Sequence, residues 1–234
     1  MIHKVPEAKV YISNHDWLTS RFLFSFADYF DEHNMSWGKL RVWNDDTIAP
    51  ESGFPMHSHQ NFEIVTIVFE GELTHADSLG NERVLRRGFI QHMSAGLGIT
   101  HSEYNNTKES LSLYQLWIAP SKLNIEPFYQ EKEIGFGKTG LHTLIQNEKH
   151  FEEEPHTTLS INANAKIFYG NLQEGETITH TCAKEEFTLI YIRSGHLAIE
   201  HHDFKAGDQA RIHEETSLFI QAKEDSEFVM VTTW

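Results

Sequence analysis

Short runs of β-branched and aromatic residues, separated by turn residues, constrain the fold of this chain more than any other feature of its sequence. Such runs occur at residues 40–43, 64–69, 84–85, 111–118, 166–169, 188–192, 197–199 and 228–232. Their length and composition are typical of strands, whereas helical periodicity is scarce. The Ser-Leu-Gly-Asn sequence at 78–81 predicts a hairpin loop. Many short strands at a spacing of roughly ten residues favour an all-β sandwich or barrel.

One segment, residues 122–155, breaks this rhythm and predicts a junction between two halves. It contains Pro127, Gly135, Gly137, Gly140, an acidic run at 152–154 and Pro155. Proline and glycine at this density are typical of connections rather than of strands, and the acidic run is expected to be a solvated turn. The 234 residues suffice for two compact domains. We therefore expect one domain over residues 1–134 and a second over residues 135–234.

Charge and cysteine usage exclude several classes of function. The formal net charge of −15 repels a phosphate backbone, which disfavours direct binding to nucleic acid. Cys182 is the sole cysteine, so no intramolecular disulfide and no cysteine-rich zinc site can form, as is usual in a reducing compartment. The start of the sequence lacks the apolar core of a signal peptide, and no apolar stretch approaches the roughly 20 residues that cross a bilayer. We expect a cytoplasmic protein without a membrane segment.

Histidine is unusually frequent, with 16 residues, and two spaced pairs suggest a metal site. His57 and His59 form one pair, and His101 and Glu103 form the other. Residues at i and i+2 of a strand project from the same face about 6 to 7 Å apart, so each pair can converge on one ion. A chain this rich in histidine contains roughly one such pair by chance, so neither pair is decisive alone. Together, two strands would supply four ligands.

The order of these residues resembles the two sequence motifs of the cupin barrel superfamily. The first motif-like stretch is His57-x-His59-x3-Glu63 followed by Gly71, and the second is Gly88 followed by Gly98-x2-His101-x3-Asn105. Within that superfamily, the stretches MHSHQNFEIVTIVFEGELTHADSLGN, FIQHMSAGLGITHSEYN and HDWLTSRFLFSFADYFD resemble the pirin family. The resemblance implies an all-β fold of two tandem cupin (jelly-roll) β-barrels, of which the C-terminal one is degenerate.

The resemblance also implies the ligands and the cofactor. In pirins the matching positions bind the metal, which here are His57, His59, His101 and Glu103. One divalent ion per chain is expected, with Fe(II) favoured and Zn, Mn, Ni, Cu or Co as alternatives, because imidazole and carboxylate ligands suit all of them. Glu63 is the competing carboxylate, since it binds metal in the general cupin pattern. We favour Glu103, because Glu63 lies about 13 Å beyond His59 on a regular strand unless the chain turns between them.

The second half carries only a weak copy of these motifs. It offers Gly175, His180, Cys182 and Glu186, as if the second histidine of a first motif had become cysteine. No counterpart of the second motif follows Gly207. We expect this barrel to bind no metal.

The activity that the resemblance implies is that of quercetin 2,3-dioxygenase, which cleaves a flavonol ring with O2. Glu103 would then act both as a ligand and as the catalytic proton acceptor, with a small aromatic, flavonol-like substrate and O2 as partners. Two alternatives stay open: a redox- or metal-sensing binding protein that regulates a transcription factor or enzyme, and a metal-dependent cupin isomerase. A cupin fold alone does not choose between them.

Two further groups of residues admit a structural and a functional interpretation. Phe54, Met56 and Met93 flank the ligand segments and are either core residues or the lining of a substrate pocket. A basic group, Arg83, Arg86 and Arg87, follows the predicted hairpin and is either solvated or a contact for an acidic protein partner.

Overall fold

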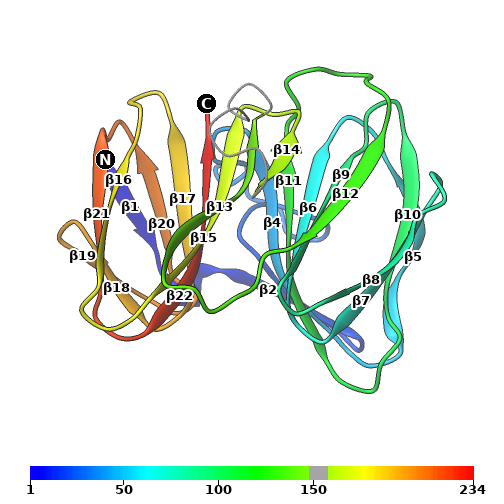
Figure 1. Cartoon of the computed structure of the whole chain (residues 1–234), viewed down its shortest axis with the longest axis horizontal. Helices are drawn as coiled ribbons and strands as arrows, with labels where there is room; N and C mark the ends of the chain where they lie inside the picture. Colours follow the sequence, from blue (N-terminus) through cyan, green and yellow to red (C-terminus); the bar gives the residue numbers. More distant parts are fainter. Residues whose placement is uncertain (148–157) are drawn as a thin grey trace.

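The computed structural model describes residues 1–147 and 158–234 of the chain, and the regular secondary structure of these residues is almost entirely β-strand. Every strand-like run of the sequence lies within an observed strand, which confirms the all-β prediction. The Ser-Leu-Gly-Asn loop joins two paired strands, as expected. The acidic run at 152–154 lies outside the described residues. Figure 1 shows two barrels side by side, which is the tandem arrangement that the sequence implies.

The first barrel is built from two antiparallel sheets. Its seven-stranded sheet has the order β12 (Phe128–Glu133), β9 (Phe89–Ser94), β6 (Glu63–Glu70), β11 (Leu111–Ile118), β4 (Leu40–Ile48), β3 (Leu18–Phe22) and β2 (Tyr11–His15). Its four-stranded sheet has the order β5 (Ser52–His59), β10 (Ile99–Asn105), β7 (Glu72–Asp77) and β8 (Glu82–Arg86). The smaller sheet carries both predicted ligand pairs, on β5 and β10.

The second barrel repeats this plan, except that one edge pair of its larger sheet is parallel. Its seven-stranded sheet has the order β1 (Ile2–Val5), β20 (Gln209–His213), β17 (Phe187–Ser194), β22 (Ser226–Thr233), β15 (Ala165–Leu172), β13 (Gly140–Asn147) and β14 (Leu159–Ile161). Its four-stranded sheet has the order β16 (Thr177–Thr181), β21 (Ser217–Ala222), β18 (His196–Ile199) and β19 (His202–Lys205). A short 3-10 turn, η1 (Glu7–Lys9), follows β1.

The two barrels share one apolar core at their junction. Trp43 of β4 has no exposed surface, and its ring contacts Tyr114 of the same barrel and Tyr191 of the second barrel at centroid distances of 5.8 and 5.7 Å. The Tyr191 hydroxyl donates a hydrogen bond of 2.9 Å to Asp45, which also crosses the junction. Aromatic contact and apolar burial together stabilise this arrangement of the two barrels.

The chain changes sheet between β12 and β13. β12 pairs with β9 of the first barrel, and β13 pairs with β15 of the second. The domain boundary expected between 134 and 135 stays a prediction. The strand β1 departs from a simple division by chain position, because it pairs with β20 at the edge of the second barrel's large sheet, as the blue strand among yellow and orange ones in Figure 1 shows.

Among the described residues, no helix has the length and apolar character that crossing a membrane requires.

Candidate metal centre

The strands β5 and β10 place three histidines at one end of the first barrel. His57 lies directly opposite His101 in the antiparallel pairing of these strands, and His59 lies opposite Ile99. β5 is the edge strand of its sheet, which explains how it accommodates Pro55 without losing a central ladder hydrogen bond. An edge position also leaves His57 and His59 partly exposed, whereas His101, on the inner strand β10, is buried.

A shift in register separates His101 from Glu103. The pairing of β10 with β5 is displaced here, as in a β-bulge, because two steps along β10 oppose three steps along β5. The extra residue therefore lies in β5, and β10 keeps a regular register with β7, so His101 and Glu103 share one face. Gly53 of β5 lies against this point, and a Cβ atom there would collide with the backbone of Glu103 and Tyr104. Glycine is therefore required for β5 to approach β10 at the displaced register.

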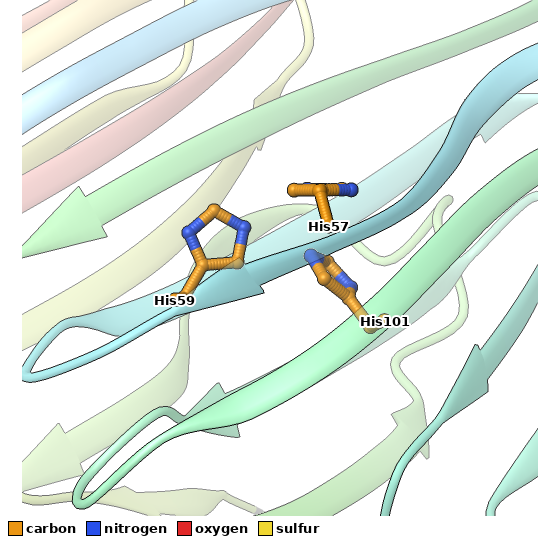
Figure 2. Close-up of side chains that lie close together, drawn as sticks. All are labelled: His57, His59 and His101. Carbon is orange, nitrogen blue, oxygen red and sulfur yellow. The ribbon is translucent and has the colours of Figure 1, made fainter.

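The three imidazole rings converge, as Figure 2 shows. The ring centroids of His57 and His101 are 4.4 Å apart, those of His57 and His59 are 4.7 Å apart, and those of His59 and His101 are 4.9 Å apart. One ring nitrogen of each histidine lies within 4.8 Å of the others. This spacing is small enough for one ion to draw all three nitrogens to its coordination distance of about 2.0 to 2.2 Å with modest side-chain rotation.

The nitrogens at this site are short of hydrogen-bond partners. Within the part of the chain that the structure describes, Nε2 of His59 and both ring nitrogens of His101 are buried without a partner. Nδ1 of His57 lies 2.8 Å from the carbonyl oxygen of Pro55, which fixes the proton on Nδ1. The lone pair of Nε2 is therefore available to bind a metal. Unpaired buried polar atoms are costly, and a bound cation would satisfy them. The donor set therefore fits a divalent metal.

The electrostatics of the site favour neutral imidazoles, the form that binds metal. Burial, together with the neighbouring His57 and His75 rings, lowers the pKa of His101 to about 3. Burial, together with His101 and His57, lowers the pKa of His59 to about 4. Protons therefore compete weakly with a metal for these two ligands at neutral pH.

Glu103 is buried next to His101 and is held by three hydrogen bonds. Gln91 and Gln115 donate amide N–H groups to its two carboxylate oxygens at 2.6 Å each, and the Thr66 hydroxyl donates at 3.2 Å. The carboxylate forms a second compact group with His101 and His75, whose donor atoms also lie within 4.8 Å of one another. Glu103 thus adjoins the three-histidine cluster through His101. Its role as fourth ligand is carried forward as a proposal.

The competing carboxylate, Glu63, is engaged elsewhere. β5 ends at His59 and residues 60–62 form a turn, with Asn61 at a φ of 53°, so the regular strand assumed for the 13 Å estimate is not present. After this turn the Glu63 side chain accepts hydrogen bonds from His92 and Ser94 at 2.7 Å each. Neither group of metal-ligating side chains found among the described residues includes Glu63.

Sequence reasoning missed His75. This residue has no exposed surface, and it lies directly opposite Glu103 in the pairing of β7 with β10. In the structure residues 73, 75 and 77 of β7 are buried in turn and 72, 74 and 76 are less so. The sequence signal was the i, i+2 spacing of His75 and Asp77, because only Leu73 on the buried face is apolar. The pairing of β7 with β10, which brings His75 to the site, is not visible in a single sequence.

Apolar side chains around the cluster divide between core and surface. Met93 is 1% exposed and belongs to the core, whereas Met56 is 57% exposed beside His57. Phe54 is intermediate and packs edge-on against Trp17 at 5.0 Å. Trp117 of β11 contacts the His59 ring edge-on at 4.7 Å and so forms an apolar wall on the barrel side of the cluster.

The motif-like residues of the second barrel have different surroundings. His180 of β16 lies opposite Leu218, where the corresponding first-barrel histidine faces another histidine. Burial raises the pKa of the Cys182 thiol to about 11, and the Glu186 carboxylate accepts a turn hydrogen bond from the backbone N–H of Ala183. That this barrel binds no metal stays a prediction.

The arginine group has partners within its own barrel. Arg86 lies 2.7 Å from a carboxylate oxygen of Glu72, Arg83 lies 3.5 Å from one of Glu131, and Arg87 donates to the carbonyl of Phe69 at 2.7 Å. These contacts favour the structural interpretation of the group.

The chain matches two family models and is similar to known proteins over nearly its whole length. Residues 5–118 match the Pirin family model, and residues 152–232 match a model described as the quercetinase C-terminal cupin domain. A pirin-like protein of Caulobacter vibrioides is 38% identical over 232 residues, which cover 99% of each chain. Quercetin 2,3-dioxygenase of Escherichia coli K12 is 35% identical over 219 residues, which cover 93% of this chain and 92% of that protein.

A solved structure agrees over the whole chain. The crystal structure of bacterial pirin YhhW from Escherichia coli, in complex with nickel(II), matches with a TM-score of 0.93 and 34% identity, covering 100% of this chain and 99% of that one.

Proposed function

The chain belongs to the pirin family, and we propose that it is a metal-dependent dioxygenase that cleaves the ring of a flavonol such as quercetin with O2. One observation carries the proposal: three convergent histidines, of which His59 and His101 have unpartnered buried nitrogens, lie beside a buried carboxylate that is already held in place. A relative named quercetin 2,3-dioxygenase supports the substrate class.

We propose His57, His59, His101 and Glu103 as the residues that hold one divalent ion. Three imidazoles and a carboxylate suit Fe(II), Mn, Ni, Cu, Co or Zn and leave coordination positions open. Fe(II) is our first choice, and the nickel(II) complex of a related pirin supports a site that accepts more than one metal. When bound, the ion would supply Lewis acidity toward a flavonol hydroxyl and redox chemistry toward O2.

The side chains around the ion would perform the remaining tasks. Glu103 would accept the proton of the flavonol hydroxyl, because it is the buried carboxylate next to His101 and its orientation is fixed by Gln91 and Gln115. Trp117 and Phe54 would restrict water on the apolar side, and the exposed Met56 would lie at the entrance for an aromatic substrate.

The reaction has a mass balance that makes it easy to test. Both atoms of O2 enter the products, and one ring carbon of the flavonol leaves as CO. Protein freed of metal with a chelator and reloaded separately with Fe(II), Ni(II) or Mn(II) should bleach the absorbance of quercetin in air. CO should be released in proportion, and neither change should occur without O2 or with the His101→Ala variant.

The opposite result would favour the other functions. If every metal-loaded form leaves quercetin and related flavonols intact by mass spectrometry, the dioxygenase proposal fails. A sensor that recognises a protein partner, or an isomerase that needs no O2, would then be the better hypothesis for the function of this site.

We propose that the protein is cytoplasmic, in keeping with its single, half-buried cysteine.

A further inference from the structure

A buried histidine–aspartate pair lies directly behind the metal centre. Nε2 of His75 is 3.0 Å from a carboxylate oxygen of Asp77, and neither side chain of this ion pair is exposed. Asp77 is held in turn by the β7–β8 hairpin, through hydrogen bonds from Asn81 and from the backbone N–H of Leu79. The pair is therefore a rigid part of the barrel.

The pair fixes which nitrogen of His75 carries the proton. The Asp77 carboxylate accepts N–H groups from the backbone of Leu79 and Asn81 and from the Asn81 side-chain amide. A carboxylate that accepts on both oxygens is also the acceptor toward His75, so Nε2 of His75 donates and Nδ1 carries the lone pair. The Tyr129 ring stacks on His75 with centroids 4.7 Å apart, which fixes the plane of the imidazole.

The strand register places His75 beside the proposed metal ligands. Asp77 lies opposite His101, and His75 lies opposite Glu103, in the pairing of β7 with β10. The ring centroids of His75 and His101 are 5.5 Å apart. One ring nitrogen of each, together with a Glu103 oxygen, lies within 4.8 Å of the others.

The two histidines have complementary needs. Nδ1 of His75 and both ring nitrogens of His101 are buried without a partner among residues 1–147 and 158–234. If one nitrogen of His101 binds the ion, the other must carry a proton and needs an acceptor. Nδ1 of His75 is an acceptor without a partner beside His101, whereas the Glu103 oxygens already accept from Gln91, Gln115 and Thr66 and are proposed to bind the ion.

We propose that Asp77 and His75 form a positioning device for the metal centre, in which Nδ1 of His75 accepts the ring N–H of His101 and fixes the orientation in which His101 binds the ion. The two rings are not hydrogen-bonded to each other in this structure, so the bond would form as the ion orients His101, while Asp77 and Tyr129 keep His75 in place. The inference rests on the metal centre of the proposed function but not on its substrate. Metal binding measured without any flavonol therefore tests it separately from the dioxygenase activity.

The test compares metal affinity and ligand-field signature in variants of the metal-free protein. His75→Phe keeps an aromatic ring of similar size but has no acceptor, whereas His75→Asn keeps an acceptor near the position of Nδ1. We expect His75→Phe to weaken Ni(II) and Co(II) binding by about 10- to 100-fold in competition with a chelator of known affinity. We also expect it to alter the visible spectrum of the Co(II) form, and His75→Asn to restore most of both properties.

Asp77→Asn tests the other member of the pair. Its amide can donate to Nε2 of His75, which would move the proton to Nδ1 and present a donor where His101 requires an acceptor. We expect weaker Co(II) binding than in the unaltered protein, with the same spectral change as in His75→Phe.

His92→Phe is the matched control. His92 is equally buried in the same barrel and also pairs with a carboxylate, that of Glu63 at 2.7 Å, but it does not face the three-histidine cluster. We expect it to lose stability and keep its Co(II) affinity and spectrum. The proposal is wrong if folded His75→Phe binds Co(II) as the unaltered protein does, or if His92→Phe weakens binding equally. It is also wrong if the unaltered protein binds two ions per chain and His75→Phe binds only one, because His75 would then itself be a ligand of the second ion.

Discussion

The Glu63 carboxylate lies 2.7 Å from Nε2 of His92, and both side chains are almost completely buried. A second bond from the Ser94 hydroxyl occupies the other carboxylate oxygen. Glu63 is the carboxylate that the general cupin pattern would assign to the metal, yet its partners here are those of a structural residue. The two candidate carboxylates of this barrel therefore have different surroundings, and separate substitutions can tell their roles apart.

Glu103→Gln should weaken metal binding at least about tenfold and abolish flavonol turnover, because an amide is a poor ligand for a divalent ion and cannot accept the substrate proton. Glu63→Gln should keep its metal, since the amide can still bond to His92. Metal content after dialysis and quercetin turnover give the two readouts. The reverse pattern, with metal lost only in Glu63→Gln, would restore the general cupin arrangement.

His57→Ala and His101→Ala should each lower metal affinity by more than about 100-fold, since loss of a ligand costs more than loss of an outer hydrogen bond. His180→Ala, the corresponding change in the second barrel, should leave one ion per chain. Elemental analysis of protein purified without added metal measures all three. Full occupancy in the first two variants, or two ions per chain in the unaltered protein, would contradict the assignment.

Asp46 should make the folded protein less stable as the pH rises from about 4 to about 7. Burial raises its pKa to about 7 against the lowering effect of the Ser20 hydroxyl, whereas the unfolded chain has an ordinary value of about 3.9. The folded state therefore binds more protons over this window, and its stability falls until the group ionises near pH 7.

Asp46→Asn removes this effect. Relative to the unaltered protein it should gain stability with rising pH, by on the order of 4 kcal/mol between pH 4 and pH 8. Urea unfolding of the metal-free proteins at several pH values measures the difference. A difference that does not change with pH would show that Asp46 is ionised throughout.

Tyr191→Phe should destabilise the protein by about 1 to 3 kcal/mol, because it removes a buried hydrogen bond to Asp45 across the junction of the two barrels. Tyr11→Phe is the matched control, since its hydroxyl bonds to Asp28 at 3.3 Å on the exposed surface. This second change should alter stability by less than about 0.5 kcal/mol. Equal effects in thermal unfolding would mean that the bond at the junction is not specifically stabilising.

The strands and the three-histidine cluster were predictable because both depend on spacing along the chain. Alternation and β-branched composition identify a strand locally, and an i, i+2 pair such as His57 and His59 shares a face whatever the strand's neighbours. That His101 would lie near this pair was predicted from the resemblance of the residue order to the two cupin motifs. The structure brings these three residues together as expected.

Features that depend on pairing between distant strands were not predictable. His75 reaches the site only through the register of β7 on β10, and a shift of one residue would turn it to the other face. The turn at residues 60–62 redirects Glu63, and the bulge in β5 sets which residues of β5 lie opposite Glu103. A single sequence contains no direct record of register, so these relationships appear only in three dimensions.

The crossing of β1 into the second barrel's sheet has a consequence for engineering. β2, only a few residues later, belongs to the first barrel. The chain therefore connects the two barrels twice, between β1 and β2 and between β12 and β13. Neither barrel can therefore be exchanged as one continuous segment. A chimera that replaced the N-terminal half of the chain would also remove β1 from the sheet of the second barrel. Grafting the three-histidine cluster onto another pirin should succeed better by transplanting β5, β7 and β10 than by swapping halves.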